Sequence, residues 1–202
     1  MVLNKKNKNV MSNNKFINRI RLTNSIVCLL LISGLFLHVR AQQRDVPEPV
    51  LIDSAFNLYQ IGNIYLSGQP DQEEFASLAN NGVKLIINIR TAGEMKKFAD
   101  EEFDEASYVK GLQVDYLNVG VGGPDGYNPE VIDVIANKIK ASKGKVLIHC
   151  RSAARATMVW MAWLVRTGQS SIDEAINLGK KARYSTSFED LLGFPVTEKR
   201  VK

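Results

Sequence analysis

The sequence predicts an α/β fold in which helices flank a central, mainly parallel β-sheet. Short apolar segments alternate along the chain with amphipathic ones, and this order of elements builds a layered α/β domain. Residues 83–89 (VKLIINI) and 145–149 (KVLIH) are mostly apolar, as is typical of strands that a parallel sheet buries on both faces. Apolar residues make up 45% of the chain, which excludes disorder for most of it.

Capping residues and glycines set the expected boundaries of the elements. Asp71 and Glu74 have the spacing of a capping box, as do Ser171 and Glu174, so each pair predicts the start of a helix. Gly82 predicts the end of the first of these helices. In chain order we expect strands over 56–60 and 64–67, a helix over 71–81, a strand over 83–89, a helix over 94–110, a strand over 113–119, a glycine-rich loop over 120–129, a helix over 130–140, a strand over 145–149, an apolar helix ending near 165 and a helix over 171–182.

The first 41 residues have the pattern of a secretory signal. A basic stretch precedes an apolar run over 26–39, and Val39-Arg40-Ala41 suits cleavage after Ala41. The run is shorter than the roughly 20 residues that a spanning helix needs. We therefore expect an exported protein, periplasmic or secreted, with no stable membrane association after cleavage; the alternative is an uncleaved N-terminal membrane anchor.

The charge distribution supports this division of the chain. Residues 1–41 carry seven of the 26 basic residues and none of the 21 acidic ones, so the rest of the chain is slightly acidic. The pI of about 9.2 is thus no sign of a nucleic-acid partner. After the signal we expect a linker over 42–55, one domain over 56–187 and a tail over 188–202. The oligomeric state is not readable from the sequence.

Cys150 is the centre of the candidate site. It follows the strand over 145–149, and a loop from 150 to 154 leads into an apolar helix. Such a loop points backbone N–H groups and the positive end of a helix dipole at one spot, which favours an anion and a thiolate. Arg155 starts the helix and supplies a planar fork of donors suited to a tetrahedral oxyanion. Either feature alone is weak, since a cysteine after an apolar strand is often an inert core residue; together they favour a reactive thiol.

Three stretches in this order resemble a known group. They are IYLSGQPDQEEFASLANNGVKLIINIRTAGE (64–94), DYLNVGV (115–121) and HCRSAARAT (149–157). The chain resembles the cysteine-dependent protein tyrosine phosphatase superfamily, in particular its bacterial dual-specificity-like branch, similar to the phosphatase-like domain of beta-lactamase hydrolase-like proteins. The resemblance covers about residues 56–185 and implies a dual-specificity-phosphatase-like fold whose phosphate-binding loop joins a strand to a helix.

The resemblance implies hydrolysis of a phosphomonoester through a thiophosphoryl intermediate on Cys150, with no cofactor and no metal. The partner it implies is a phosphorylated protein or small molecule. It assigns the general acid to Asp125, with Asp115 and Glu130 as fallbacks. The phosphate-binding residues are Arg151, Ser152, Ala153, Ala154 and Arg155, and the supporting residues are His149, Arg90 and Thr157.

The loop departs from the family pattern at two places. Ala153 stands where many relatives have glycine, so a positive φ there would strain the backbone. Ala156 replaces the hydroxyl residue that usually helps the thiolate leave, and Thr157 comes one residue late. Two alternatives therefore stay open: a rhodanese-like sulfurtransferase, whose loop has similar spacing, and a phosphate-binding module with impaired turnover.

Overall fold

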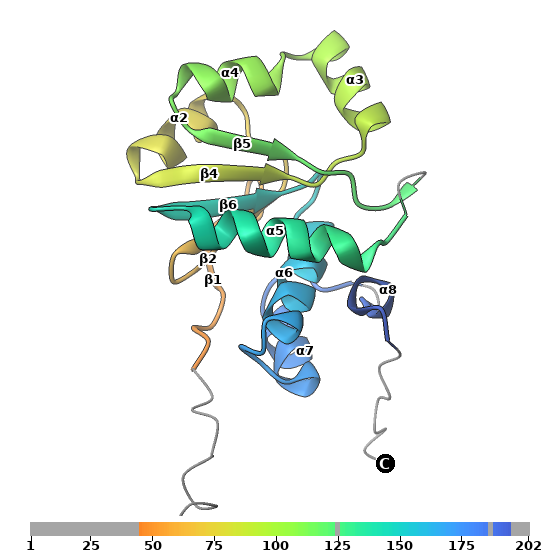
Figure 1. Ribbon diagram of the computed structural model, residues 1–202. Helices are drawn as coiled ribbons and strands as arrows, with labels where there is room; N and C mark the ends of the chain where they lie inside the picture. Colours follow the sequence, from red (N-terminus) through yellow and green to blue (C-terminus); the bar gives the residue numbers. More distant parts are fainter. Residues whose placement is uncertain (1–44, 124–125, 186–187, 195–202) are drawn as a thin grey trace, which may run out of the picture. The chain divides into compact units, whose positions relative to one another are not determined.

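The computed structural model describes residues 45–123, 126–185 and 188–194, and within them it contains a six-stranded mixed sheet (Figure 1). The strand order is β1-β2-β3-β6-β4-β5. The first three strands pair antiparallel, while β3, β6, β4 and β5 run parallel to one another. The strands are β1 (Val50–Asp53), β2 (Leu58–Ile61), β3 (Ile64–Ser67), β4 (Val83–Asn88), β5 (Asp115–Asn118) and β6 (Lys145–His149). The predicted α/β fold is confirmed.

Helices cover both faces of this sheet (Figure 1). One face packs against α5, α6, α7 and α8, and the other packs against α2 and α4. The helices are α2 (Gln72–Asn80), α3 (Ala92–Glu101), α4 (Glu105–Gly111), α5 (Pro129–Ala141), α6 (Ala154–Arg166), α7 (Ile172–Lys180) and α8 (Glu189–Leu192). None of the helices in the described ranges is long and apolar enough to cross a membrane.

The carboxyl ends of the four parallel strands lie in one row. Ser67 of β3 is in register with His149 of β6, which is in register with Asn88 of β4, and Asn88 is in register with Asn118 of β5. Ligands of open α/β sheets bind beyond this edge. The segment that begins at Cys150 therefore emerges where such a site is expected.

The structure corrects three boundaries. Residues 50–53, expected in a linker, form the edge strand β1. The single helix expected over 94–110 is two helices, because Phe103 packs edge-on against Phe75 and Asp104 then caps α4 by accepting from Ser107 N–H at 3.1 Å. The tail expected from residue 188 begins inside the core, where Phe188 and α8 are packed.

Candidate active site

The loop after Cys150 is supported by the Ser-Gly-Gln turn that follows β3. Cys150 N–H donates to Ser67 O at 3.3 Å, and Gln69 N–H donates to Arg151 O at 3.3 Å. Only glycine fits between them, since a Cβ on Gly68 would lie 2.7 Å from Phe56 O and 3.2 Å from Arg151 O. The turn thus holds the backbone of Cys150 and Arg151 in place. The buried thiol lies on the side of the sheet that packs against α6.

Ala153 has a left-handed conformation, with φ of +67°, so the backbone strain expected at this position is present. This conformation costs a non-glycine residue roughly 1–2 kcal/mol. Two features stabilise this backbone conformation. The Ala153 side chain is fully buried, and Thr157 Oγ1 donates to Ala153 O at 3.0 Å. The structure therefore directs the Thr157 hydroxyl to the loop backbone.

Ala153 is also the N-cap of α6, and it makes no side-chain capping hydrogen bond. The N-cap side chain of most helices satisfies one of the first N–H groups. The first turn of α6 is instead left to an external acceptor, and the helix dipole favours a negative one. The side chains of Arg151 and Ser152 are exposed at the mouth of this loop, and Ala154 is half-buried.

Arg155 is oriented by a carboxylate that sequence reasoning did not single out. Its Nη1 and Nη2 atoms donate to Glu94 Oε2 at 2.8 Å and Oε1 at 2.7 Å, and Nη1 also donates to Val121 O at 2.9 Å. These hydrogen bonds from Arg155 hold the pKa of Glu94 at about 2, against partial burial that raises it. Three of the five guanidinium N–H groups bind acceptors among the described residues. The Nε–H and one Nη2–H bind no acceptor there, and they form a second fork for an oxyanion.

Arg90 braces this pair. Its Nη1 donates to Gln69 Oε1 at 2.6 Å, its Nε lies 3.8 Å from Glu94 Oε1, and its guanidinium carbon lies 4.9 Å from the centre of the Phe98 ring. The side chain is 8% exposed. Arg90 was expected as a supporting residue, and the structure places it against Glu94, the carboxylate that binds Arg155.

His149 points away from the thiol to the opposite face of the sheet, as strand alternation predicts. Its ring packs edge-on against Phe75, and its Nε2 lies 3.1 Å from Glu105 Oε1. Both side chains are 0% exposed, so this contact is shielded from solvent. The first residue of α4 therefore touches the residue that precedes Cys150.

Three side chains donate hydrogen bonds to the Glu105 carboxylate, beside the nearby imidazole of His149. Its Oε1 accepts from Asn88 Nδ2 at 2.8 Å and from Tyr116 OH at 2.8 Å, and its Oε2 accepts from Gln69 Nε2 at 2.6 Å. Burial raises the pKa of this carboxyl, but the charge of His149 and these hydrogen bonds outweigh burial and hold it at about 2. Burial and then the charge of Glu105 raise the pKa of Tyr116.

The general-acid candidates differ in where they lie. Asp125 lies outside the described residues. Asp115 begins β5, at the sheet edge opposite Cys150, so the fold does not bring it to the loop. Glu130 lies in the first turn of α5 and accepts from Asn128 Nδ2 at 3.2 Å.

Tyr127 is a second side chain that sequence reasoning missed. It is 41% exposed, and its hydroxyl and the Arg155 side chain both border Gly122, at 3.3 and 3.7 Å from where a Cβ would lie. An exposed aromatic side chain thus lies close to the aliphatic part of Arg155. In the sequence, Tyr127 lies within a glycine-rich loop, and no motif there indicates that it lies near Arg155.

A family model described as "Beta-lactamase hydrolase-like protein, phosphatase-like domain" matches residues 60–166, just over half of the chain. A beta-lactamase hydrolase-like protein of Xylella fastidiosa is 31% identical over 115 residues, which cover 56% of this chain and 26% of that protein. The human dual specificity protein phosphatase 9 is 25% identical over 143 residues, which cover 70% of this chain and 35% of that protein. The chain thus spans about a quarter to a third of the length of these relatives.

Among solved structures, P. aeruginosa TpbA in complex with pTyr has the same fold. The TM-score is 0.52 at 14% sequence identity, and the match covers 76% of this chain and 96% of that one.

The buried Glu105 predicts how stability depends on pH. Its pKa is about 2 in the folded chain, below the ordinary value of 4.5, so its stabilisation is present above 4.5 and is lost as the pH falls toward 2. We expect Glu105→Gln to lower the free energy of unfolding at pH 7 by about 3 kcal/mol and to flatten its fall between pH 4.5 and 2.

Denaturant titrations across this pH range measure both effects. The matched control is Glu102→Gln, an exposed carboxyl three residues away, which we expect to leave slope and stability nearly unchanged. A Glu105→Gln slope equal to that of the parent chain would contradict the assignment.

Proposed function

The chain belongs to the phosphatase-like domain family of beta-lactamase hydrolase-like proteins, within the protein tyrosine phosphatase-like superfamily, and from this premise we propose that it is an exported, cysteine-dependent phosphomonoesterase. The observation that carries the proposal is the shared position of three groups at one sheet edge: the Cys150 thiol, the uncapped first turn of α6 and the free fork of Arg155.

The proposed reaction begins with the substrate phosphoryl group in the loop. Backbone N–H groups of the first turn of α6 and the Arg155 fork hold its equatorial oxygens and stabilise the charge that develops on them. The Cys150 thiolate attacks phosphorus, so an S–P bond forms as the ester P–O bond breaks. We assign the proton on the leaving oxygen to Asp125, the loop carboxyl that the resemblance indicates.

Water then completes the cycle. It attacks the phosphorus of the thiophosphoryl group, the S–P bond breaks, and the products are inorganic phosphate and the regenerated thiolate. Ala156 carries no hydroxyl, and Thr157 donates to Ala153 O, so neither side chain assists the leaving thiolate in this arrangement. We therefore expect this second step to be slow relative to the first.

The substrate class proposed is a phosphorylated protein or a small phosphorylated molecule. The pTyr bound by P. aeruginosa TpbA and the exposed Tyr127 beside Arg155 favour an aryl phosphate as the first substrate to try. Export is proposed from the basic and apolar pattern of residues 1–41. These residues lie outside the described ranges.

Hydrolysis of p-nitrophenyl phosphate by the full chain, reduced and with chelator present, tests the function. We expect turnover that Cys150→Ser abolishes, because a hydroxyl at this position lacks the nucleophilicity of a thiolate. Inorganic phosphate should still bind this variant, because the loop and Arg155 remain.

The same samples separate the alternatives. Phosphate binding without turnover in the parent chain would indicate a binding module. Transfer of sulfur from thiosulfate to cyanide would indicate a sulfurtransferase instead.

Glu94 is expected to act by orienting Arg155. Glu94→Ala leaves the guanidinium free to turn, so we expect kcat/KM for p-nitrophenyl phosphate to fall by roughly 10- to 100-fold. Glu94→Gln keeps one acceptor oxygen and should lie between the two. Steady-state kinetics on the three proteins measure the order. An Ala variant faster than the parent would mean that Glu94 competes with the substrate for Arg155.

A further inference from the structure

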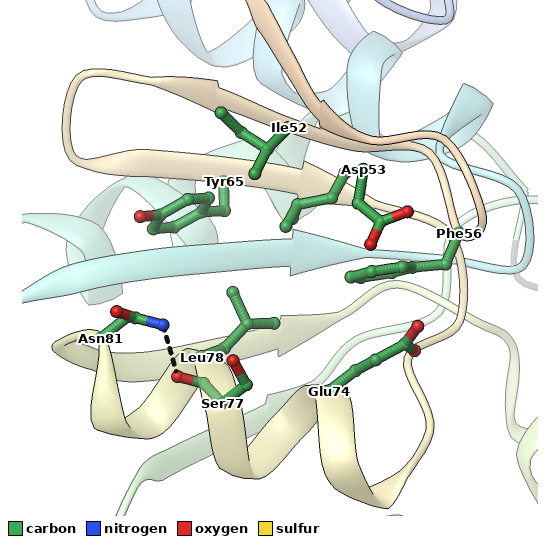
Figure 2. Close-up of a pocket in the computed structure, with 9 residues that line it drawn as sticks. Ile52, Asp53, Phe56, Tyr65, Glu74, Ser77, Leu78 and Asn81 are labelled. Carbon is green, nitrogen blue, oxygen red and sulfur yellow. Dashed lines mark hydrogen bonds between the residues drawn. The ribbon is translucent and has the colours of Figure 1, made fainter.

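A cavity of about 230 Å³ opens between the edge of the sheet and α2, away from Cys150 (Figure 2). Its apolar walls include Phe56, Leu58 and Leu78, which belong to the core on the α2 face of the sheet. In Figure 2, Ile52 and Asp53 extend from β1 on one side, and Glu74 rises from α2 on the other. Cavities for drug-sized ligands measure roughly 300–1,000 Å³, so this one suits a single side chain.

The strand at its rim is built to present side chains. Asp53 is paired with Leu58 and Leu51 with Tyr59, so Ile52 is an extra residue that makes a β-bulge. Bulges at sheet edges redirect side chains, and here Ile52 and Asp53 both line the cavity. The three residues Val50, Leu51 and Ile52 are 58%, 51% and 52% exposed.

The outer edge of β1 is free within the described residues, since β1 ends the strand order and pairs with β2 alone. An edge strand of this kind offers backbone N–H and C=O groups to an added extended strand. Exposed apolar side chains along the same strand give that segment a surface to pack on. The geometry therefore favours an extended peptide over a helix.

Charge selects the kind of side chain that enters the cavity. The described lining residues include two carboxylates, Asp53 and Glu74, and no basic side chain. Burial, and then the charges of Asp71 and Asp53, raise the pKa of Glu74, whereas a backbone hydrogen bond at Asp71 opposes the rise. The repulsion between these carboxylates is relieved when a positive charge enters between them.

We propose that this groove docks an extended, basic segment of a partner protein. The segment pairs with the free edge of β1 and places one lysine or arginine side chain in the cavity. The aliphatic stem packs on Phe56, Leu58 and Leu78, and the charged head lies between Asp53 and Glu74. Because the proposal concerns binding, it stands whether or not the chain hydrolyses phosphate esters.

The test measures binding of a fluorescent, acetylated and amidated peptide of alternating valine and lysine to the full chain. The test variant is Asp53→Asn with Glu74→Gln. Both changes keep the acceptor oxygens that now bind Ala55 N–H and Asp71 N–H, at 2.7 Å each, so the local fold is retained. The control variant is Glu73→Gln with Asp100→Asn, which removes the same charge from exposed positions outside the cavity.

We expect the parent and the control variant to bind alike and the test variant to bind roughly tenfold more weakly. A peptide with diaminopropionic acid in place of lysine has too short a stem and should also bind more weakly than the lysine peptide. Equal affinities for the test and control variants would overturn the proposal, because binding would then follow net charge alone.

Sedimentation velocity of the same proteins tests whether a second copy of the chain binds the free edge of β1 instead. We expect the parent and the test variant to sediment alike. A dimer of the parent that the test variant dissociates would overturn the proposal, because a second copy of the chain would then occupy the groove.

Discussion

The buried carboxylate of Glu105 constrains the ends of all four parallel strands. Its neighbours are Gln69 in the turn that follows β3, Asn88 in β4, Tyr116 in β5 and His149 in β6. A buried charge is costly unless hydrogen bonds satisfy it. Moving these partners apart would leave the Glu105 carboxylate buried without enough hydrogen bonds, which is strongly destabilising. The carboxyl ends of the strands beneath the loop that begins at Cys150 are thereby held in place by the fold itself.

A second carboxylate does the same for the charged part of the site. Glu94 accepts two hydrogen bonds from one edge of the Arg155 guanidinium, and Val121 O accepts a further one. Arg90 lies next to the Glu94 carboxylate. The remaining fork of Arg155 is held in one orientation as a result. The loop is held on both sides, and it can therefore retain at Ala153 a backbone conformation that alanine alone disfavours.

The elements that local pattern specifies could be predicted from the sequence. The Asp71–Glu74 capping box, the apolar β4 and β6, and the loop from Cys150 into α6 all lie where they were expected. The strand β1 was missed because its four exposed residues follow a proline-rich stretch and show no buried face.

The two carboxylates could not be predicted because their roles depend on distant partners. Glu94 and Glu105 lie in a charged segment that resembled one solvated helix, and Glu94 is 61 residues from Arg155 in the sequence. The one local signal was the spacing of Thr91 and Glu94, which form a capping box just after β4. That spacing predicts a helix start but does not indicate that the same carboxylate binds Arg155.

The proposed reaction passes through a covalent intermediate on Cys150. Rapid mixing of the full chain with p-nitrophenyl phosphate, acid quenching and peptide mass spectrometry test this most directly. We expect one phosphoryl group on the peptide that contains Cys150, and we expect it to accumulate because attack by water is the slower step. Turnover with the phosphoryl group on another residue, or with Cys150 unmodified at every quench time, would contradict it.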